Sequence, residues 1–381
     1  MTLLYTEIEE DLRASVRDLL ADRCGPGVVL RRVESATPYD AELWKTLAQE
    51  IGVAGLLVPE EHGGAGASAR ETAVVLEELG RAVAPLPFLT SSVLAVSALL
   101  GSGDGLLGAL AAGEATAALV VPFAVSPYRF AETATVRDGV LSGQVRAVAG
   151  ADVADVLLVP AGGGLYAVDA ADATVEVVPS LDLTRPIATV TLSSAPGRRI
   201  EGADGGDVRR ALLTGAGLLA SEQLGVAEWC LNTTLAYIKE RHQFARPVGS
   251  FQAIKHRMAD LWLDVVRARA AARNAAHLLA GATGPAVGGD ERDGQDERDG
   301  RDGQDGRDTE LAVAVAKSWC SEVALRVAEE SVQLHGGIGM TWEHPVHLYL
   351  KRAKAGEIAL GTPGVHRDAV AVLADLPGPV A

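Results

Sequence analysis

Clustered positive charge is the first thing that this sequence lacks. Its 381 residues contain 34 Lys and Arg against 50 Asp and Glu, which gives a formal net charge of −16. Nucleic acids and anionic lipid surfaces have to be met by grouped Lys and Arg side chains. We therefore expect neither a nucleic acid nor a membrane as a partner.

The sequence also has few cysteines, and it shows neither the pattern of a secretory signal nor an uninterrupted apolar run of membrane-spanning length. Cys24, Cys230 and Cys320 are an odd number without metal-ligand spacing, which predicts reduced thiols and no metal site. Residues 1–20 are acidic and amphipathic, unlike a secretory signal. Residues 89–112 are apolar, but serines and glycines interrupt them short of a membrane span of about 20 residues. These features predict a cytoplasmic protein.

The spacing of apolar residues divides the sequence into three parts. In residues 1–113 they recur every three or four positions, which predicts helices. In residues 114–203 they form short or alternating runs rich in Val and Thr, which predicts a small antiparallel barrel or sandwich. The helical period returns in residues 204–381. The expected fold class is α+β, with an N-terminal helical domain, a central antiparallel β-domain and a C-terminal four-helix bundle.

An acidic segment interrupts the last part. Residues 288–310 contain ten acidic residues and four arginines, and no apolar residue occurs in 288–308. Such a segment buries too little to offset the entropy of ordering it, so a disordered loop between helices is expected. Its Asp-x-Asp-Gly patterns lack the Glu at position twelve of an EF-hand, which argues against a calcium site.

Two ordered motifs are the most informative features. One is Arg241-His-Gln-Phe-Ala-Arg-Pro-Val-Gly-Ser-Phe-Gln252, and the other is Gln333-Leu-His-Gly-Gly-Ile-Gly-Met-Thr-Trp-Glu343. The planar fork of Arg241 suits a pyrophosphate, and glycines allow backbone N–H groups to approach one closely. Taken alone, a surface arginine and a glycine turn between helices would explain the same residues.

Together these motifs resemble the acyl-CoA dehydrogenase family, and the resemblance covers nearly the whole chain. Val58-Pro-Glu-Glu-His-Gly-Gly64 and Val75-Leu-Glu-Glu-Leu-Gly80 resemble its N-terminal domain. The resemblance implies FAD as cofactor and contacts across a dimer interface, hence a homodimer or tetramer. The residues that the resemblance implies for FAD binding are Arg241, Gln243, Phe244, Gln252, Gln333, Gly336, Gly337 and Thr362.

The resemblance also implies dehydrogenation of an acyl thioester, carried by coenzyme A or an acyl-carrier protein, with an electron-transfer flavoprotein or another acceptor. This chemistry needs a carboxylate base. Where the family has Tyr-Glu-Gly-Thr, the chain reads Ala359-Leu-Gly-Thr362, so Leu360 fills the place of the base. The second known place is Gly215. The residues implied for substrate binding are Thr90, Ser91, Leu219 and Leu360.

Two other carboxylates are candidate bases. Glu222 lies seven residues after Gly215 on one predicted helix, about 10 Å further along its axis. Glu357 lies one turn before Leu360. An ion pair with an arginine of a neighbouring helix would equally explain Glu222, and one with Lys354 would explain Glu357. The nearby histidines, which suit an interface or a supporting role, are His335, His344 and His347.

The predicted β-domain departs from the family pattern. Val120-Val-Pro-Phe-Ala-Val-Ser126 stands where relatives have Thr-Glu-Pro and a Gly-Ser pair against the flavin ring. Ala147-Val-Ala149 stands in place of a Trp-Ile-Thr run. Only backbone contacts to the ring would survive these changes. Gly162-Gly-Gly164 follows a predicted strand and opens no helix, so a hairpin is expected instead of a Rossmann turn.

Three functions fit these observations. The first is FAD-dependent dehydrogenation at an unusual position, such as γ,δ of an enoyl thioester, by Glu222 in a polyketide-precursor pathway. The second is a base-less subunit in a heterotetramer with a paralogous subunit. Trp342-Glu-His-Pro345 resembles actinobacterial members that act on steroid side chains as such pairs. The third is a flavin monooxygenase on the same fold.

Overall fold

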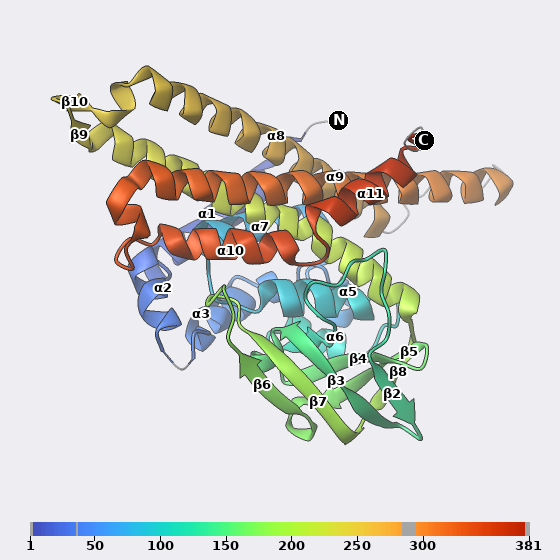
Figure 1. The fold of residues 1–381 in the computed structure, drawn as a ribbon. Helices are drawn as coiled ribbons and strands as arrows, with labels where there is room; N and C mark the ends of the chain where they lie inside the picture. The colour runs from blue at the N-terminus through green and yellow to red at the C-terminus, as the bar shows by residue number, and fades with distance from the viewer. Residues whose placement is uncertain (1–2, 36, 284–294, 378–381) are drawn as a thin grey trace.

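The N-terminal part of the chain is helical as far as Ala111 (Figure 1). The structure is a computed structural model that describes residues 3–35, 37–283 and 295–377. Capping boxes begin two of its helices, because Thr6 and Ser68 exchange side-chain to backbone hydrogen bonds with the glutamates three residues later. The elements are α1 (Glu7–Arg23), α2 (Pro26–Val33), α3 (Ala41–Lys45), the π-helix η1 (Thr46–Glu50), η2 (Val53–Gly55), η3 (Glu60–His62), α4 (Ala69–Ala82), the π-helix η4 (Phe88–Ala95), α5 (Val96–Leu99) and α6 (Leu106–Ala111).

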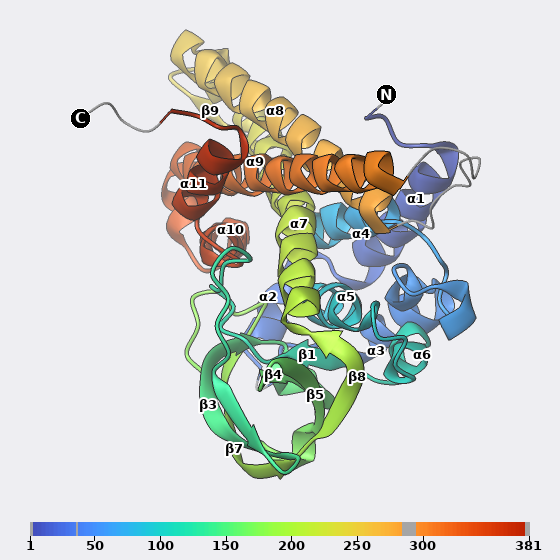
Figure 2. The same cartoon turned by 90° about the vertical axis from the view of Figure 1, so that its right-hand side faces the viewer.

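Two four-stranded sheets follow and share one core (Figure 2). Their strand orders are β1-β4-β5-β8 and β2-β3-β7-β6. Apolar residues of both sheets, such as Leu141 and Leu157, pack in one buried cluster. The elements are β1 (Ala117–Leu119), β2 (Ala134–Arg137), β3 (Val140–Ala149), η5 (Ala151–Val153), β4 (Val156–Ala161), β5 (Gly164–Asp169), η6 (Ala170–Asp172), β6 (Thr174–Val178), β7 (Ile187–Pro196) and β8 (Arg198–Asp204).

The β-domain differs from the expected all-antiparallel arrangement in one pair of strands. β1 runs parallel to β4, with Ala117 opposite Val156, whereas the other described pairs are antiparallel. The long connection after β1 makes this possible, since a parallel partner cannot be reached by a tight turn. The predicted hairpin is confirmed: Gly162 and Gly163 have positive φ and turn β4 into β5.

Long helices form the C-terminal part, and the predicted α+β fold is confirmed. Asp204 begins α7 in a capping box with Asp207. None of the helices in the described residues has both the length and the apolar character needed to cross a membrane. The elements are α7 (Gly205–Glu240), β9 (His242–Gln243), β10 (Arg246–Pro247), η7 (Val248–Ser250), α8 (Gln252–Thr283), α9 (Gln295–His335), η8 (Gly336–Met340), α10 (Val346–Ile358) and α11 (Pro363–Leu373).

The expectation of a disordered loop over 288–310 is wrong for its second half. Residues 295–310 belong to α9, and residues 288–294 lie outside the described part of the chain. Polar contacts with a folded neighbour support this end of the helix: Arg307 donates to the carbonyl oxygen of Leu373 (2.9 Å) and pairs with Asp375, just beyond α11. Such contacts between distant polar residues do not depend on the apolar content of the segment.

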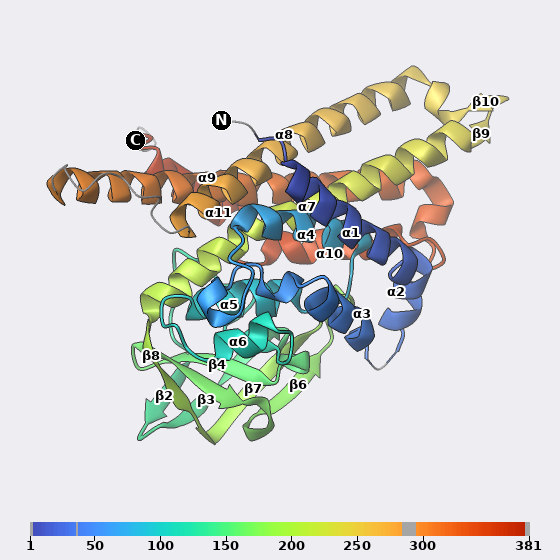
Figure 3. The ribbon, with the colours of Figure 1, turned by 180° about the vertical axis from the view of Figure 1, so that it is seen from behind.

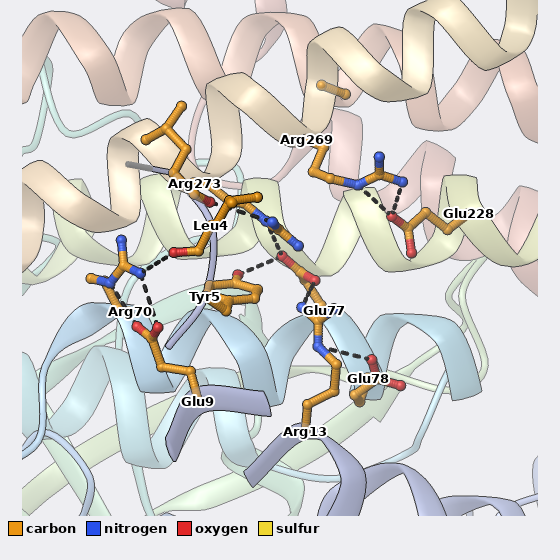
Figure 4. A network of polar contacts seen from close by, with 12 residues as sticks. Leu4, Tyr5, Glu9, Arg13, Arg70, Glu77, Glu78, Glu228, Arg269 and Arg273 are labelled. Atoms are coloured by element: carbon orange, nitrogen blue, oxygen red, sulfur yellow. Dashed lines mark hydrogen bonds and ion pairs between the residues drawn. The ribbon is translucent and has the colours of Figure 1, made fainter. Parts of the chain in front are cut away.

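Ion pairs attach the N-terminal segment to the rest of the molecule (Figure 4). The Tyr5 hydroxyl donates to Glu77 of α4 (2.6 Å), and Arg13 and Arg273 also pair with this carboxylate. Burial raises the pKa of Glu77, and the two arginines oppose that rise. Because Arg273 belongs to α8, the cluster joins α1, α4 and the bundle. The view from behind shows the ribbons of α1 and α4 on this side of the bundle (Figure 3).

Helices α4 and α7 cross at two glycines. A Cβ atom on Gly80 would fall on the carbonyl oxygen of Glu222, and one on Gly225 would fall on that of Glu77. The two backbones can approach this closely only because both positions lack a side chain. The crossing therefore fixes where α7, and Glu222 on it, sit against the N-terminal domain.

Replacing Gly225 with alanine is expected to lower the free energy of unfolding by about 2–3 kcal/mol, because the two helices must separate. Gly281→Ala in α8 is the matched control, since nothing lies within 4 Å of the added carbon. That change should raise stability by up to about 1 kcal/mol through helix propensity. Urea unfolding of both variants measures the difference. An equal change in the free energy of unfolding for the two variants would show that the crossing of α4 and α7 tolerates a side chain.

Candidate functional site

The two places at which the family carries its base lie side by side in this structure. Leu360 is fully buried, and its Cδ1 atom would be 3.1 Å from a Cβ atom built on Gly215. Leu94 of the π-helix η4 occupies the remaining space beside Gly215. Neither place holds a proton acceptor. Instead, Leu94 of η4 and Leu360 of the turn after α10 pack against α7 at Gly215.

The backbone around Leu360 is bonded on both sides. Leu360 has a φ of 53°, its N–H donates to the carbonyl oxygen of Phe123 (2.7 Å), and its own carbonyl accepts from Nε2 of His366 (2.9 Å). Phe123 lies in the connection between β1 and β2, which rises from the β-domain toward the end of α10 (Figure 2). The peptide that would border a thioester is therefore attached directly to the β-domain.

A buried lysine supports the same turn from the side of α9. Lys317 Nζ donates to the carbonyl oxygens of Gly356 (3.0 Å) and Gly361 (3.2 Å) and to Ser321 Oγ (2.9 Å). These carbonyls include one at the C-terminal end of α10, where backbone acceptors lack partners within the helix. Burial lowers the pKa of Lys317 to about 7. The lysine therefore caps α10 and fixes the turn that carries Leu360.

Glu222 lies in a buried ion-pair cluster. Its carboxylate pairs with Arg185, which precedes β7, and with Nη1 of Arg352 on α10 (3.3 Å). Burial alone would raise the pKa of Glu222, but the two arginines outweigh it and hold that pKa below its usual value. Arg352 also binds Asp182 (2.7 Å) and Thr184 Oγ1 (3.1 Å). The geometry favours the ion-pair interpretation of Glu222 that the sequence left open.

The other candidate groups are also engaged locally. Glu357 pairs with Lys354 on its own helix. Thr90 Oγ1 donates to the carbonyl oxygen of Pro87 (3.1 Å), and Ser91 Oγ accepts from the N–H of Ala117 (3.1 Å). Leu219 is buried in α7. The polar groups of the predicted substrate residues Thr90 and Ser91 are thus already bonded within the chain.

The two dinucleotide motifs lie together at the far end of the bundle from the β-domain (Figures 1 and 3). Tyr237 near the end of α7 stacks on His335 at the end of α9, with ring centroids 4.6 Å apart. The hairpin β9–β10 extends beyond them, and the side chain of Phe244 is 88% exposed. The exposed predicted residues at this end are Arg241, Gln243, Phe244, Gln252, Gln333, Gly336 and Gly337.

Thr362 does not belong to that group. It is exposed and begins α11, two residues after Leu360. The turn η8 precedes one end of α10 and Leu360 follows its other end, so about 18 Å of helix separates them. Seven of the predicted FAD residues thus form an exposed group at one end, the predicted dinucleotide face, and the eighth lies beside the Leu360 turn at the other.

Sequence reasoning missed several buried or partly buried polar residues. Arg352 follows Leu348 and Tyr349 at the spacing of one helix face, and Lys317 follows Val313 in the same way. A basic residue on an apolar helix face is expected to be buried and paired. This signal could have found these two residues, but it could not have named their partners. The other residues missed are Asp182, Arg185, Tyr128 and His366.

Comparison with known proteins gives the family. The family model of the acyl-CoA dehydrogenase N-terminal domain matches residues 6–105, and that of the C-terminal domain matches residues 206–291 and 298–372. The chain belongs to the acyl-CoA dehydrogenase family. This confirms the resemblance seen in the motifs, and with it an oxidoreductase class that acts on CH–CH bonds and uses FAD.

Similar proteins match along nearly their whole length. Acyl-CoA dehydrogenase IpdE2 from Mycolicibacterium smegmatis is 34% identical over 94% of this chain and 96% of its own. A chain of the ChsE4-ChsE5 complex from Mycobacterium tuberculosis matches with a TM-score of 0.82 and 28% identity, covering 99% of this chain and 100% of its own. A glutaryl-CoA dehydrogenase from Mycobacterium smegmatis in complex with FADH2 shares the fold, with a TM-score of 0.81, 20% identity and coverage of 100% and 96%.

The residues of this acyl-CoA dehydrogenase fit one end of FAD better than the other. At the exposed end, the planar guanidinium of Arg241 suits a pyrophosphate. Nothing lies within 4 Å of where a Cβ of Gly336 or Gly337 would be, so a ligand can approach the backbone there. Beside Leu360, the amide donor is already bonded to Phe123. The exposed end thus offers groups suited to a dinucleotide, whereas the amide donor beside Leu360 already has a partner.

Proposed function

We propose that this chain is a base-less subunit of a heteromeric acyl-CoA dehydrogenase. It presents Arg241, Gln243, Phe244, Gln333 and Gly337 to an FAD whose ring, together with the acyl thioester, is held by a second subunit. That subunit carries the carboxylate base, and the enzyme passes its electrons to an electron-transfer flavoprotein or another acceptor.

The hydrogen bond from the Leu360 N–H to the Phe123 carbonyl carries this proposal. Removal of a proton beside a thioester needs a base and free donors for the developing enolate oxygen. In this chain the base is replaced by leucine, and the neighbouring donor is already used. The exposed dinucleotide face is intact by contrast, so the chain keeps the half of the site that serves a partner.

The properties of Glu222 agree with this proposal. A general base works best when its pKa lies near the working pH. Arg185 and Arg352 instead hold the pKa of Glu222 below its usual value and bind both of its oxygens. The similarity to a chain of the two-protein ChsE4-ChsE5 complex also favours a heteromeric assembly.

Purification of the chain alone and together with a paralogue that has glutamate at the place of Leu360 tests the proposal. Alone, the chain should contain little flavin and should turn over neither saturated nor enoyl thioesters. The mixed complex should be yellow and active. Absorbance at 450 nm, gel filtration and product analysis measure these outcomes.

The result that would overturn the proposal is a flavin-replete chain that desaturates a thioester by itself. Loss of that activity in Glu222→Gln, but not in the control Glu357→Gln, would identify Glu222 as the base. A γ,δ-desaturated product from an enoyl thioester would then support a role in supplying a polyketide unit.

A further inference from the structure

The turn between α10 and α11 is held from three directions. Its backbone is bonded to the Phe123 carbonyl, to Nε2 of His366 and to Nζ of Lys317. The ring of His366 is itself held by Tyr128, whose hydroxyl lies 3.2 Å from Nδ1. Tyr128 comes from the same β1–β2 connection as Phe123, so both attachments to the β-domain meet at this turn.

The protons of this arrangement can be assigned from the acceptors. The carbonyl of Leu360 can only accept, so Nε2 of His366 carries a hydrogen, and Nδ1 of the neutral ring accepts from the Tyr128 hydroxyl. Burial lowers the pKa of His366 to about 4, and the nearby charge of Lys317 acts in the same direction. Burial also raises the pKa of Tyr128, with Glu310 adding to that rise and Arg209 opposing it. At neutral pH the ring and the phenol are therefore both uncharged, as these hydrogen bonds require.

We infer that Tyr128 and His366 act as positioning residues that attach the Leu360 turn to the β-domain and so keep Leu360 packed against Gly215 at the place of the base. The inference rests on the proposed function, because a base position kept filled by leucine suits a subunit that only completes its partner's site. Tyr128 acts through His366, and His366 acts through the carbonyl of Leu360. Loss of either side chain should therefore let the turn open without unfolding the chain.

A cysteine in place of Leu360 reports the opening of the turn. The three native cysteines are buried, with Cys24, Cys230 and Cys320 at most 3% exposed, and burial raises the pKa of each thiol. They should react slowly with a neutral thiol reagent such as a dithiodipyridine. In Leu360→Cys the new thiol should also react slowly, because it is reached only when the turn opens.

Adding His366→Ala to this reporter chain should raise the labelling rate roughly ten- to a hundredfold, the effect of removing one partner from a buried hydrogen bond. Tyr128→Phe should raise the rate less. His366→Gln should stay slow, since the amide still donates to Leu360. Tyr166→Phe, a buried tyrosine of β5, is the matched control and should change nothing.

The same substitutions in the chain without Leu360→Cys distinguish opening of the Leu360 turn from loosening of the whole fold. Faster labelling of the reporter, with the native cysteines still slow, supports the inference. An unchanged reporter in both Tyr128→Phe and His366→Ala, or a reporter that accelerates only together with the native cysteines, would overturn it. No flavin or partner enters this measurement, so its failure is distinguishable from failure of the heteromeric proposal.

Discussion

Replacing Arg352 with methionine is expected to destabilise the chain by roughly 3–5 kcal/mol, the usual effect of removing one partner from a buried ion pair. The Arg352 side chain is 2% exposed and pairs with the carboxylates of Asp182 and Glu222, which are buried equally well. The substitution leaves Asp182 without its arginine and Glu222 with only Arg185. Chemical denaturation followed by circular dichroism measures the loss.

Arg367→Met is the matched control for that variant. Arg367 pairs with Glu322, but their side chains are 56% and 43% exposed. Exposed pairs of this kind contribute about 0–1 kcal/mol. Adding Glu222→Gln and Asp182→Asn to the Arg352 variant should recover part of the lost stability. A loss as small as that of Arg367→Met would mean that water reaches the cluster.

Arg241→Ala is expected to weaken FAD binding by the assembled enzyme roughly ten- to a hundredfold, because it removes a charged hydrogen-bond donor from the dinucleotide face. The flavin should then be lost during gel filtration. Arg246→Ala on the same hairpin is the control, since that guanidinium lies 3.8 Å above the ring of Phe251. Full retention of FAD after Arg241→Ala, or a flavin-replete monomer, would refute the predicted interface.

The order of the secondary structure could be predicted because its signals are local. The apolar period changes near residue 114 and again near residue 204, and the capping pair Asp204 and Asp207 marks the second change. The acidic stretch could not be assigned in the same way. The helix found there is accompanied by a contact between Arg307 and the end of α11, 66 residues away, which the composition of the stretch does not contain.

The site could be predicted only in outline. The motifs predicted a group of dinucleotide-binding residues and a base position filled by Leu360, and the structure shows that most of that group is exposed at one end of the bundle. The motifs could not show that the Leu360 amide bonds to Phe123, because that bond depends on how the β-domain meets the bundle. For the same reason Glu222 could be placed on its helix from spacing, but its partner Arg185 lies in a connection of the β-domain.

Helix α7 has 36 residues without a break and is about 54 Å long. It begins where the last strand of the β-domain ends and stops one residue before the hairpin that carries Gln243. One residue removed from its middle would turn the hairpin by about 100° relative to the β-domain. The length of α7 therefore fixes both the distance and the angle between the β-domain and the hairpin of the predicted dinucleotide face. Insertions can accumulate in loops of this chain, but α7 has to keep its residue count.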